Sequence, residues 1–297
     1  MKKTILVAGA TGNLGEKICG ELLKQGADVK AAVRSGSDPG KVTALKNAGV
    51  TIIEVDFNNP SILESACSGA SCVISALAGL EEVIINTQSA LLYAAIKAKV
   101  PRFIPSDFCT DYTLLPLGVN RNFDLRKAFS ETINNSSIQA TSIFNGAFSY
   151  VLKYNIPLLD IKKHSIGYFE DKSDWKIDFT TLENTAAFTA CAALDDHAPR
   201  SLSIADFQIS PSELQALSEN MYNTPFQLQN LGTMDHFMET INKIRREHPE
   251  DEKELYPSWQ QMQYLYCMFA AHHQKTENER YSGIQWIPAE KVLKEIN

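Results

Sequence analysis

The chain has 297 residues, of which 44% are hydrophobic and 21% charged, a composition that suits one large or two modest globular domains and excludes a disordered chain. Its formal net charge of −7 argues against a nucleic-acid partner, because binding to a phosphate backbone needs clustered Lys and Arg. No apolar run approaches the roughly 18 residues expected of a membrane span, so we expect no membrane partner.

The first half of the chain alternates short β-branched runs with stretches of helical period, a pattern typical of βαβ units around a buried parallel sheet. The predicted strands are 4–9, 28–33, 51–56, 72–77, 102–106 and 139–144. The predicted helices, with apolar residues at three- and four-residue spacing, are 13–25, 41–48, 61–67, 82–98 and 120–134. Right-handed crossovers place helices on both faces, so we predict an α/β fold with a doubly wound parallel Rossmann sheet over residues 1–150.

After residue 150 helices and strands no longer alternate regularly, and aromatic residues become frequent. The predicted helices are 182–194, 211–222, 235–247, 259–273 and 289–296, with a strand near 202–209. We predict a smaller C-terminal α+β substrate or lid domain over residues 151–297, whose segments can interleave with the first domain. Trp259, Tyr264, Tyr266 and Phe269 include pairs at helical spacing, which is typical of a core, although one or two of them can line a substrate pocket.

The first predicted strand leads into a glycine-rich turn, Gly9-Ala10-Thr11-Gly12-Asn13-Leu14-Gly15, which opens the first predicted helix. Three glycines at this spacing, between a strand and a helix, are typical of dinucleotide binding. The first glycine permits a tight turn, the second lets the backbone approach a pyrophosphate, and the third lets the helix pack closely on the strand. We predict that Gly9, Thr11, Gly12, Asn13, Leu14 and Gly15 bind the cofactor through exposed N–H groups, and a turn without a ligand is the alternative.

The end of the second predicted strand indicates which nicotinamide cofactor binds. A carboxylate there would bind the ribose 2′-hydroxyl, whereas an arginine accepts a 2′-phosphate. The strand ends at Arg34, Lys41 can add a second positive charge, and the only acid of the strand, Asp28, stands at its beginning. Because arginine offers two parallel hydrogen bonds to a phosphate, we predict NADP(H) as the cofactor. Arg34 as a merely solvated surface charge is the alternative.

Later strand ends supply further cofactor candidates, because ligands of such sheets lie outside the carboxyl ends of the strands. Asp56 and Phe57 can flank the adenine ring, and Ser75, Ala76 and Leu77 can line the ribose and the nicotinamide. Packing in the core is the alternative for Phe57 and Leu77.

Besides the glycine turn, Arg34 and Asp56-Phe57, the sequence contains four further characteristic segments: Pro105-Ser106-Asp107-Phe108, Phe123-Asp124-Leu125-Arg126-Lys127, Asn145-Gly146-Ala147-Phe148 and Tyr281-Ser282-Gly283. Together these segments resemble the NmrA-like and isoflavone reductase-like branch of the atypical short-chain dehydrogenase/reductases. The likeness covers nearly the whole chain, and its Pro-Ser-Asp-Phe element is more specific than the glycine motif. The resemblance implies a Rossmann domain with a small C-terminal substrate domain, a preference for NADPH, and a cleft that accepts flat or aromatic molecules.

The sequence departs from this family at an expected catalytic position. The plant aromatic-ether reductases of the family have a lysine where this chain has Arg126, and Lys127 stands one residue later. One helical step turns a side chain by about 100°, so Lys127 reaches the same place only if the helix register shifts. Arg126 can point into the cleft and stabilise a developing oxyanion, although arginine is a poor proton donor. Arg126 and Lys127 are therefore the two catalytic candidates.

Four further residues are candidates for the substrate site. Ser106 lies at the carboxyl end of the fifth predicted strand, where a polar group can contact substrate, and a turn or N-cap role is the equal alternative. Phe108, Asn145 and Phe148 would shape the substrate pocket.

Other patterns carry less weight. Tyr93 and Lys97 have the Tyr-x-x-x-Lys spacing of typical short-chain dehydrogenases, but they precede the predicted strand 102–106, whereas the catalytic pair of those enzymes follows it. The six histidines show no ligand spacing, so no metal site is predicted. The six cysteines form no Cys-x-x-Cys pair, and no secretory apolar segment follows the N-terminal Met-Lys-Lys, which favours a cytoplasmic location.

Two functions fit these observations. As an enzyme, a monomer or homodimer, the protein would be an NADPH-dependent reductase that transfers hydride to a small aromatic, quinone-like or carbonyl substrate, with Arg126 polarising the acceptor. A quinone needs little acid catalysis, so the missing lysine matters least for that class. As a non-catalytic redox sensor, the same domain would bind NADP(H) and present its C-terminal helices to a protein partner. The enzyme is the favoured hypothesis.

Overall fold

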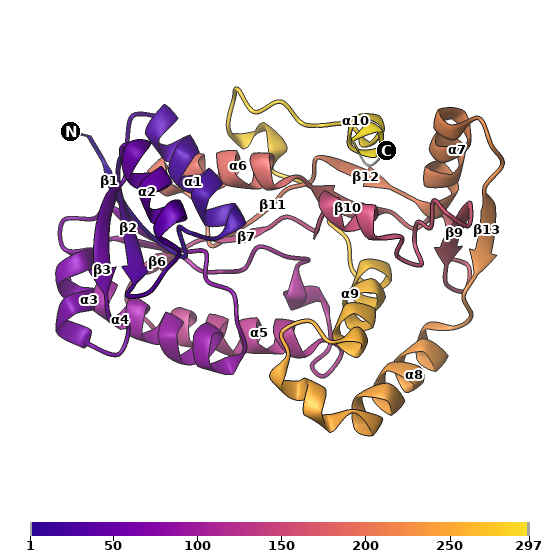
Figure 1. Ribbon diagram of the computed structural model, residues 1–297, viewed down its shortest axis with the longest axis horizontal. Helices are drawn as coiled ribbons and strands as arrows, with labels where there is room; N and C mark the ends of the chain where they lie inside the picture. Colours follow the sequence, from indigo (N-terminus) through magenta and orange to yellow (C-terminus); the bar gives the residue numbers. More distant parts are fainter. Residues whose placement is uncertain (1, 296–297) are drawn as a thin grey trace.

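A computed structural model describes residues 2–295 and places a six-stranded parallel sheet at the centre of the first part of the chain (Figure 1). Its strand order is β3-β2-β1-β4-β5-β6. The strands are β1 (Thr4–Ala8), β2 (Asp28–Arg34), β3 (Thr51–Val55), β4 (Cys72–Ser75), β5 (Arg102–Ile104) and β6 (Gln139–Ala140). Because the chain crosses from edge strand β3 to β4, the carboxyl ends of β1 and β4 form the switch point at which such sheets bind ligands. The predicted Rossmann sheet is confirmed.

Helices cover both faces of this sheet (Figure 1). One face carries α1 (Asn13–Lys24), α2 (Pro39–Asn47) and α6 (Leu182–Leu194). The other carries α3 (Pro60–Cys67), α4 (Gln88–Lys97), which continues the π-helical η1 (Glu82–Thr87), and α5 (Arg121–Asn134). The starts of α2 and α3 follow from local chemistry, because each begins with a proline after a capping side chain, Asp38 and Asn59 respectively.

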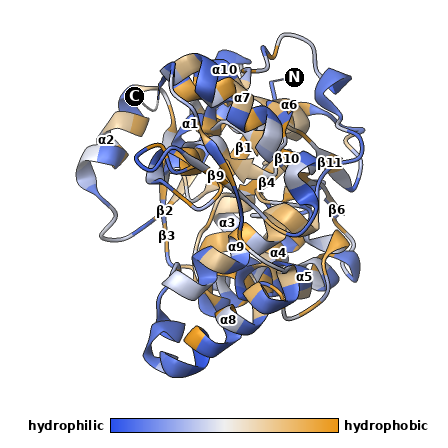
Figure 2. Cartoon of the chain, turned by 90° about the vertical axis from the view of Figure 1, so that its right-hand side faces the viewer, coloured by the Kyte–Doolittle hydropathy of each residue, from blue (hydrophilic) through white to orange (hydrophobic). Residues whose placement is uncertain are grey.

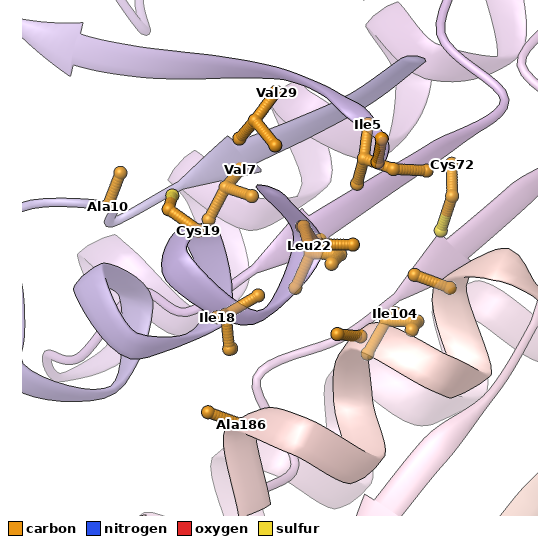
Figure 3. Packing of buried hydrophobic residues seen from close by; sticks show 14 of the residues in the cluster. Ile5, Val7, Ala10, Ile18, Cys19, Leu22, Val29, Cys72, Ile104 and Ala186 are labelled. Atoms are coloured by element: carbon orange, nitrogen blue, oxygen red, sulfur yellow. The ribbon is translucent and has the colours of Figure 1, made fainter. Parts of the chain in front are cut away.

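Alternate residues of each central strand bury the two faces of the sheet. Ile5 and Val7 of β1 pack with α1 and α6, whereas Leu6 and Ala8 pack with α3 and α4, since successive side chains of a strand point to opposite sides. All four are fully buried. Figure 3 shows the first of these layers, in which side chains of β1 and α1 pack together. Burying each large side chain stabilises the fold by about 1.5–3 kcal/mol.

The later part of the chain forms a smaller mixed layer. There β10 (Ile177–Thr180) pairs with β12 (Phe207–Ile209) and β8 (Ala147–Phe148), and β9 (Ser165–Tyr168) pairs with β13 (Gln227–Asn230). The helices are α7 (Pro211–Tyr222), α8 (Met234–Glu247), α9 (Ser258–Ala270) and α10 (Ala289–Lys294). Short 3₁₀ turns occur in both parts of the chain. The first part contains η2 (Tyr112–Leu114), and the others are η3 (Ser149–Tyr154), η4 (Lys172–Asp174), η5 (Pro249–Lys253) and η6 (Asn278–Arg280). Figure 2 shows that α8 lies at the edge of the molecule and is mostly hydrophilic.

Several segments that follow residue 150 in the sequence pack against elements of the first part of the chain. Helix α6 packs against α1, and β11 (Ser201–Ser203) pairs with β7 (Ser142–Phe144). Near the end of the chain, the Tyr281 ring lies 4.9 Å from the Phe188 ring of α6, measured between centroids. Within residues 2–295, no helix is long and apolar enough to cross a lipid bilayer.

Two predicted strands are wrong as single elements. The predicted strand 139–144 is β6 and β7, which have different partners, and the change falls at Thr141, whose hydroxyl donates to the Pro199 carbonyl (2.7 Å). The predicted strand 202–209 is β11 and β12. The Ile204 N–H still donates to β7, whereas the Asp206 N–H donates to β10, so the chain changes sheets within two residues.

Other elements differ less. The sequence does not predict β8, β9, β10 or β13, which are short strands whose partners lie far along the chain. The predicted helix 259–273 ends at Ala270, because Ala271 has an extended backbone. The predicted helix 289–296 corresponds to α10, and Ile296 lies outside the described residues.

Candidate functional site

The turn between β1 and α1 is shaped by its glycines. Gly9 has a φ of 82°, in the left-handed region, and a Cβ there would lie 2.5 Å from the carbonyl oxygen of Ala76. A Cβ on Gly15 would lie 2.2 Å from the carbonyl oxygen of Gly9. Both positions therefore require glycine for α1 to start against the ends of β1 and β4. Gly12 differs, because it is exposed and its Cβ would meet only the Gly9 oxygen, at 3.2 Å.

The first turn of α1 has no side-chain cap. Gly12 stands at the N-cap position and provides no side-chain hydrogen bond, whereas Asp38, Asn59 and Asn120 cap α2, α3 and α5. The N–H groups of this first turn thus remain available to an anion, which the helix dipole also favours. The Leu14 side chain packs against the core, and its backbone N–H belongs to this first turn.

Two positive charges accompany the turn. Lys41 on α2 donates from Nζ to the carbonyl oxygen of Thr11 (3.1 Å). Arg34 ends β2 and is exposed, and its guanidinium makes no hydrogen bond or ion pair within residues 2–295. Asn13 is exposed beside the turn. These residues fit the phosphates of a dinucleotide, because free N–H groups and two cations that form no ion pair within residues 2–295 stand together at the switch point of the sheet.

The residues that follow β3 are engaged in local structure. The Asp56 carboxylate accepts a hydrogen bond from the Asn58 N–H (2.9 Å), which stabilises the turn. Phe57 is buried and packs in the core layer that contains Leu63. The structure thus places Phe57 in the core and Asp56 at the surface of the turn.

The end of β4 lies directly beside the glycine turn. The Ala76 N–H donates to the carbonyl oxygen of Ala8 (2.8 Å), and the Leu77 carbonyl accepts from the Ser106 hydroxyl (2.6 Å). The Ser75 hydroxyl is fully buried and has no hydrogen-bond partner in the described part of the chain. Of the three β4 candidates, Ala76 and Leu77 are partly exposed at this edge.

Asp107 is a buried acid just after β5. It is 1% exposed, and Oδ2 accepts hydrogen bonds from the hydroxyls of Tyr112 (2.9 Å) and Ser142 (2.7 Å). Burial raises the pKa of the Asp107 carboxyl above its ordinary value, although these two hydrogen bonds act in the opposite direction. Its neighbour Ser106 is also engaged, because its N–H donates to the Gln88 side chain (2.9 Å). Both residues therefore fix the loop that follows β5.

The two catalytic candidates on α5 point to different places. Arg126 is half-buried and donates from Nε to the Ser106 carbonyl (2.9 Å) and from Nη1 to the Asn122 carbonyl (2.8 Å). Its guanidinium therefore lies at the carboxyl end of β5. Lys127 donates from Nζ to the carbonyl oxygen of Leu115, in the loop that precedes α5. The one-residue offset thus separates the two side chains, as the helical step predicts.

The remaining substrate-site candidates have unequal exposure. Asn145 follows β7 and is fully buried, and neither its side-chain oxygen nor its nitrogen has a hydrogen-bond partner within residues 2–295. Buried amides are nearly always hydrogen-bonded, so this side chain is suited to a bound ligand. Phe148 is half-buried and stacks on Tyr150, with ring centroids 5.7 Å apart. Phe108 is only 8% exposed and belongs to the core.

Two tyrosines stand near Arg126, and the sequence singles out neither as a catalytic group. Tyr264 of α9 accepts a hydrogen bond from the Asn122 side-chain amide (3.0 Å), and Tyr256 lies 6.3 Å from it between ring centroids. The spacing of Asn122 and Arg126, four residues apart on α5, is the one sequence signal that could have grouped this cluster. Tyr93 is instead 56% exposed on α4.

Two surface hollows lie away from these residues. One of about 510 Å³ is lined by residues between 133 and 140 and between 196 and 200, and one of about 420 Å³ by residues between 53 and 66. Neither includes the glycine turn or Arg126. In the described part of the chain, no three His, Cys, Asp or Glu side chains gather as a metal site.

Comparison with known proteins adds independent findings. The model of the NmrA-like family matches residues 1–229. Pinoresinol reductase 2 of Arabidopsis thaliana is 29% identical over 216 residues, 68% of this chain and 67% of that protein. Isoflavone reductase homolog IRL of Zea mays is 40% identical over 116 residues, but the match spans only 37% of either chain. The solved structure of AtPrR2 with NADP⁺ and (+)pinoresinol shares the fold, with a TM-score of 0.81 at 22% identity over 100% of this chain and 99% of that one.

Proposed function

The chain belongs to the NmrA-like family, and from this premise we propose that it is an NADPH-dependent reductase of a small aromatic, quinone-like or carbonyl substrate. The observation that carries the proposal is the uncapped glycine turn at the switch point of the sheet, with Arg34 and Lys41 beside it. Relatives named pinoresinol reductase and isoflavone reductase homolog, and a neighbouring structure that contains NADP⁺, support the same function.

The cofactor preference follows from the charges at the turn. The pyrophosphate would lie on the N–H groups that follow Gly12. The 2′-phosphate, which distinguishes NADP(H) from NAD(H), would lie between Arg34 and Lys41. Each charge-assisted hydrogen bond of this kind contributes about 1.5–3 kcal/mol, and no carboxylate at the end of β2 competes for the ribose.

Arg126 is the group that we assign to the acceptor. When bound, the cofactor would supply hydride from its nicotinamide ring. Arg126 would place a permanent positive charge beside the acceptor oxygen, where negative charge develops. Its two hydrogen bonds to backbone carbonyls fix the guanidinium before substrate arrives, so little reorganisation is needed. The unpartnered amide of Asn145 would bind the cofactor or the substrate.

Aromatic side chains near Arg126 favour a flat substrate. Tyr150 and Tyr256 are 40% and 54% exposed, and each lies beside another aromatic ring, Phe148 and Tyr264 respectively. Rings of this kind bind an aromatic acceptor by stacking or by edge contacts. A quinone is the least demanding of the proposed acceptors, because its reduced oxygens can take protons from water.

A second candidate function is a non-catalytic NADP(H)-dependent redox sensor. It is favoured by one observation, namely that Lys127 is bound to the Leu115 carbonyl and leaves only an arginine at the position of the family lysine. Such a protein would bind the cofactor at the same turn and would change its contacts with a protein partner in response. A cytoplasmic location and a monomeric or homodimeric state are parts of the enzyme proposal.

The proposal is tested by following NADPH oxidation by the purified protein with a panel of quinones, aromatic aldehydes and enones. Cofactor binding is measured separately by fluorescence titration. Saturable turnover of any of these acceptors supports the reductase. Tight NADPH binding without turnover of any acceptor contradicts the reductase and leaves the sensor.

A further inference from the structure

Asn122 fixes two side chains of the candidate site at once. It is 1% exposed, and its backbone carbonyl accepts from Arg126 Nη1 (2.8 Å). Its side-chain nitrogen donates to the Leu255 carbonyl and to the Tyr264 hydroxyl, both at 3.0 Å. Its side-chain oxygen accepts from Arg121 Nε (3.1 Å). An arginine can only donate and a carbonyl can only accept, so the orientation of the Asn122 amide is fixed.

This fixed orientation decides the role of the Tyr264 hydroxyl. Because the hydroxyl accepts a hydrogen from Asn122, its own hydrogen must point elsewhere. Within residues 2–295 the Tyr264 hydroxyl donates no hydrogen bond, and the bond from Asn122 is the one it accepts. Tyr264 is half-buried, and its ring packs edge-on against Phe123 with centroids 5.3 Å apart. The ring position is therefore fixed by α5, and the hydroxyl keeps one free donor.

Arg126 also keeps a free donor group. Its Nε and Nη1 bind backbone carbonyls, whereas Nη2 has no hydrogen-bond partner in the part of the chain that the structure describes. The side chain is half-buried, as Tyr264 is. Burial raises the pKa of Tyr264 to about 12, and the positive charge of nearby Arg126 acts in the opposite direction. The tyrosine is therefore protonated at working pH, and its anion would be stabilised by Arg126.

We propose that the Tyr264 hydroxyl and Arg126 Nη2 form a two-donor site for the oxygen of the acceptor, and that Tyr264 supplies the proton that an arginine cannot give. This inference rests on the proposed reductase function. NADPH would supply the hydride from its nicotinamide C4–H bond. As this hydride added to the carbonyl carbon, the C=O π pair would move to the oxygen, the Tyr264 O–H bond would break, and a new O–H bond would form on the product. The tyrosinate, held by Asn122 and Arg126, then takes a proton from water.

The assignment narrows the substrate class. The two donors would meet one oxygen that gains negative charge, as in a quinone, an aromatic carbonyl or an enone. Tyr264 of α9 thus supplies the proton donor that the missing lysine would have provided, and it lies against α5, the helix that carries Arg126.

The direct test is the binding of 4-nitrophenol to the full-length protein, which needs no turnover. The absorption spectrum of this probe distinguishes bound phenolate from bound phenol. At a pH below the pKa of the free probe, the wild-type protein should bind it as phenolate. Tyr264→Phe should weaken this binding about 10- to 100-fold, the effect of losing a hydrogen bond to a charged group. The matched control Tyr266→Phe, which removes a hydroxyl from the same helix, should bind as wild type.

A turnover measurement completes the test and separates the two proposals. Tyr264→Phe should lower kcat for a carbonyl acceptor while the Kd for NADPH stays unchanged. Phenolate binding that is equal in the wild type and Tyr264→Phe would overturn the two-donor site, even if the wild type is an active reductase. If the wild type binds phenolate through Tyr264 but oxidises no NADPH with any acceptor, the two-donor site stands and the reductase function fails.

Discussion

Nε of Arg126 lies 2.9 Å from the carbonyl oxygen of Ser106, so a permanent cation of α5 is fixed at the carboxyl end of β5. A lysine one residue later cannot make this contact, and Lys127 binds the Leu115 carbonyl instead. The position of the cation thus follows from helix geometry and from one backbone hydrogen bond. We therefore propose Arg126 as the group that contacts the acceptor.

The first prediction concerns Arg126 itself. Arg126→Ala should lower kcat about 10²- to 10³-fold, as the loss of an oxyanion donor does in other enzymes, while the Kd for NADPH is retained. Lys127→Ala is the comparison. It should lower kcat less, since the Lys127 amine is bound to the Leu115 carbonyl. Steady-state kinetics with one quinone and one aromatic aldehyde measure both variants. If kcat falls further in Lys127→Ala than in Arg126→Ala, Lys127 and not Arg126 is the catalytic residue.

The second prediction concerns cofactor choice. Arg34→Ala should raise the Kd for NADPH about 10- to 100-fold, because one charge-assisted hydrogen bond to the 2′-phosphate is lost. The Kd for NADH should hardly change, since NADH lacks that phosphate. Fluorescence titration with each cofactor measures the two Kd values and hence their ratio. An Arg34→Glu variant that still prefers NADPH would remove Arg34 from the site.

The third prediction separates the folding and binding roles of the glycines. Gly15→Ala should strongly destabilise the protein, because its Cβ would lie 2.2 Å from the Gly9 oxygen. Gly12→Ala should fold, since its Cβ meets only that oxygen at 3.2 Å, but should bind NADPH more weakly. Gly20→Ala is the control, with nothing within 4 Å of its Cβ, and should stabilise α1 by about 0.5–1 kcal/mol. Thermal melts with and without NADPH measure all three.

The fourth prediction concerns acid stability. Asp195 is partly buried, which acts to raise its pKa, but hydrogen bonds from Arg280, the His197 N–H and Tyr281 lower it to about 2. A carboxyl whose pKa is lowered on folding stabilises the folded state above its unfolded value, near 3.8, and loses this contribution as pH falls towards 2. Asp195→Asn should therefore lower the free energy of unfolding by about 1–2 kcal/mol at pH 6, and by progressively less below pH 4.

Urea unfolding at several pH values tests this effect. The difference in unfolding free energy between the wild type and Asp195→Asn should shrink as the pH is lowered from 6 to 3. A difference that is constant over this range would show that the contact between Asp195 and the C-terminal segment does not depend on the charge of the carboxylate.

The main sheet could be predicted because β1 to β5 lie in local apolar runs, each with a helix after it before the next strand of the sheet. Prediction from the sequence fails where one short apolar run is divided between two strands that pair with different partners. This happens at Thr141, between β6 and β7, and at Ala205, between β11 and β12. The four strands that the sequence does not predict are two to four residues long, too short for an alternating pattern. Their pairing depends on tertiary contacts, which periodicity does not encode.

The same distinction applies to the site. The glycine turn is local, and its required backbone shape could be read from the spacing of Gly9, Gly12 and Gly15. The contact between Asn122 and Tyr264 joins residues 142 positions apart and depends on how α9 packs against α5. From the sequence alone, Tyr264 is therefore one of several aromatic residues of a predicted helix, and nothing distinguishes it from the others.

The most direct test of the reductase is the transfer of deuterium from the nicotinamide C4 of labelled NADPH to an aromatic acceptor. Protein and acceptor are incubated with each of the two C4-deuterated forms of NADPH, and the product is examined by mass spectrometry. The account predicts one deuterium on carbon in the product of one labelled form and none in that of the other. Cofactor that binds tightly but passes deuterium to no carbonyl or enone acceptor would contradict hydride transfer and would favour the sensor.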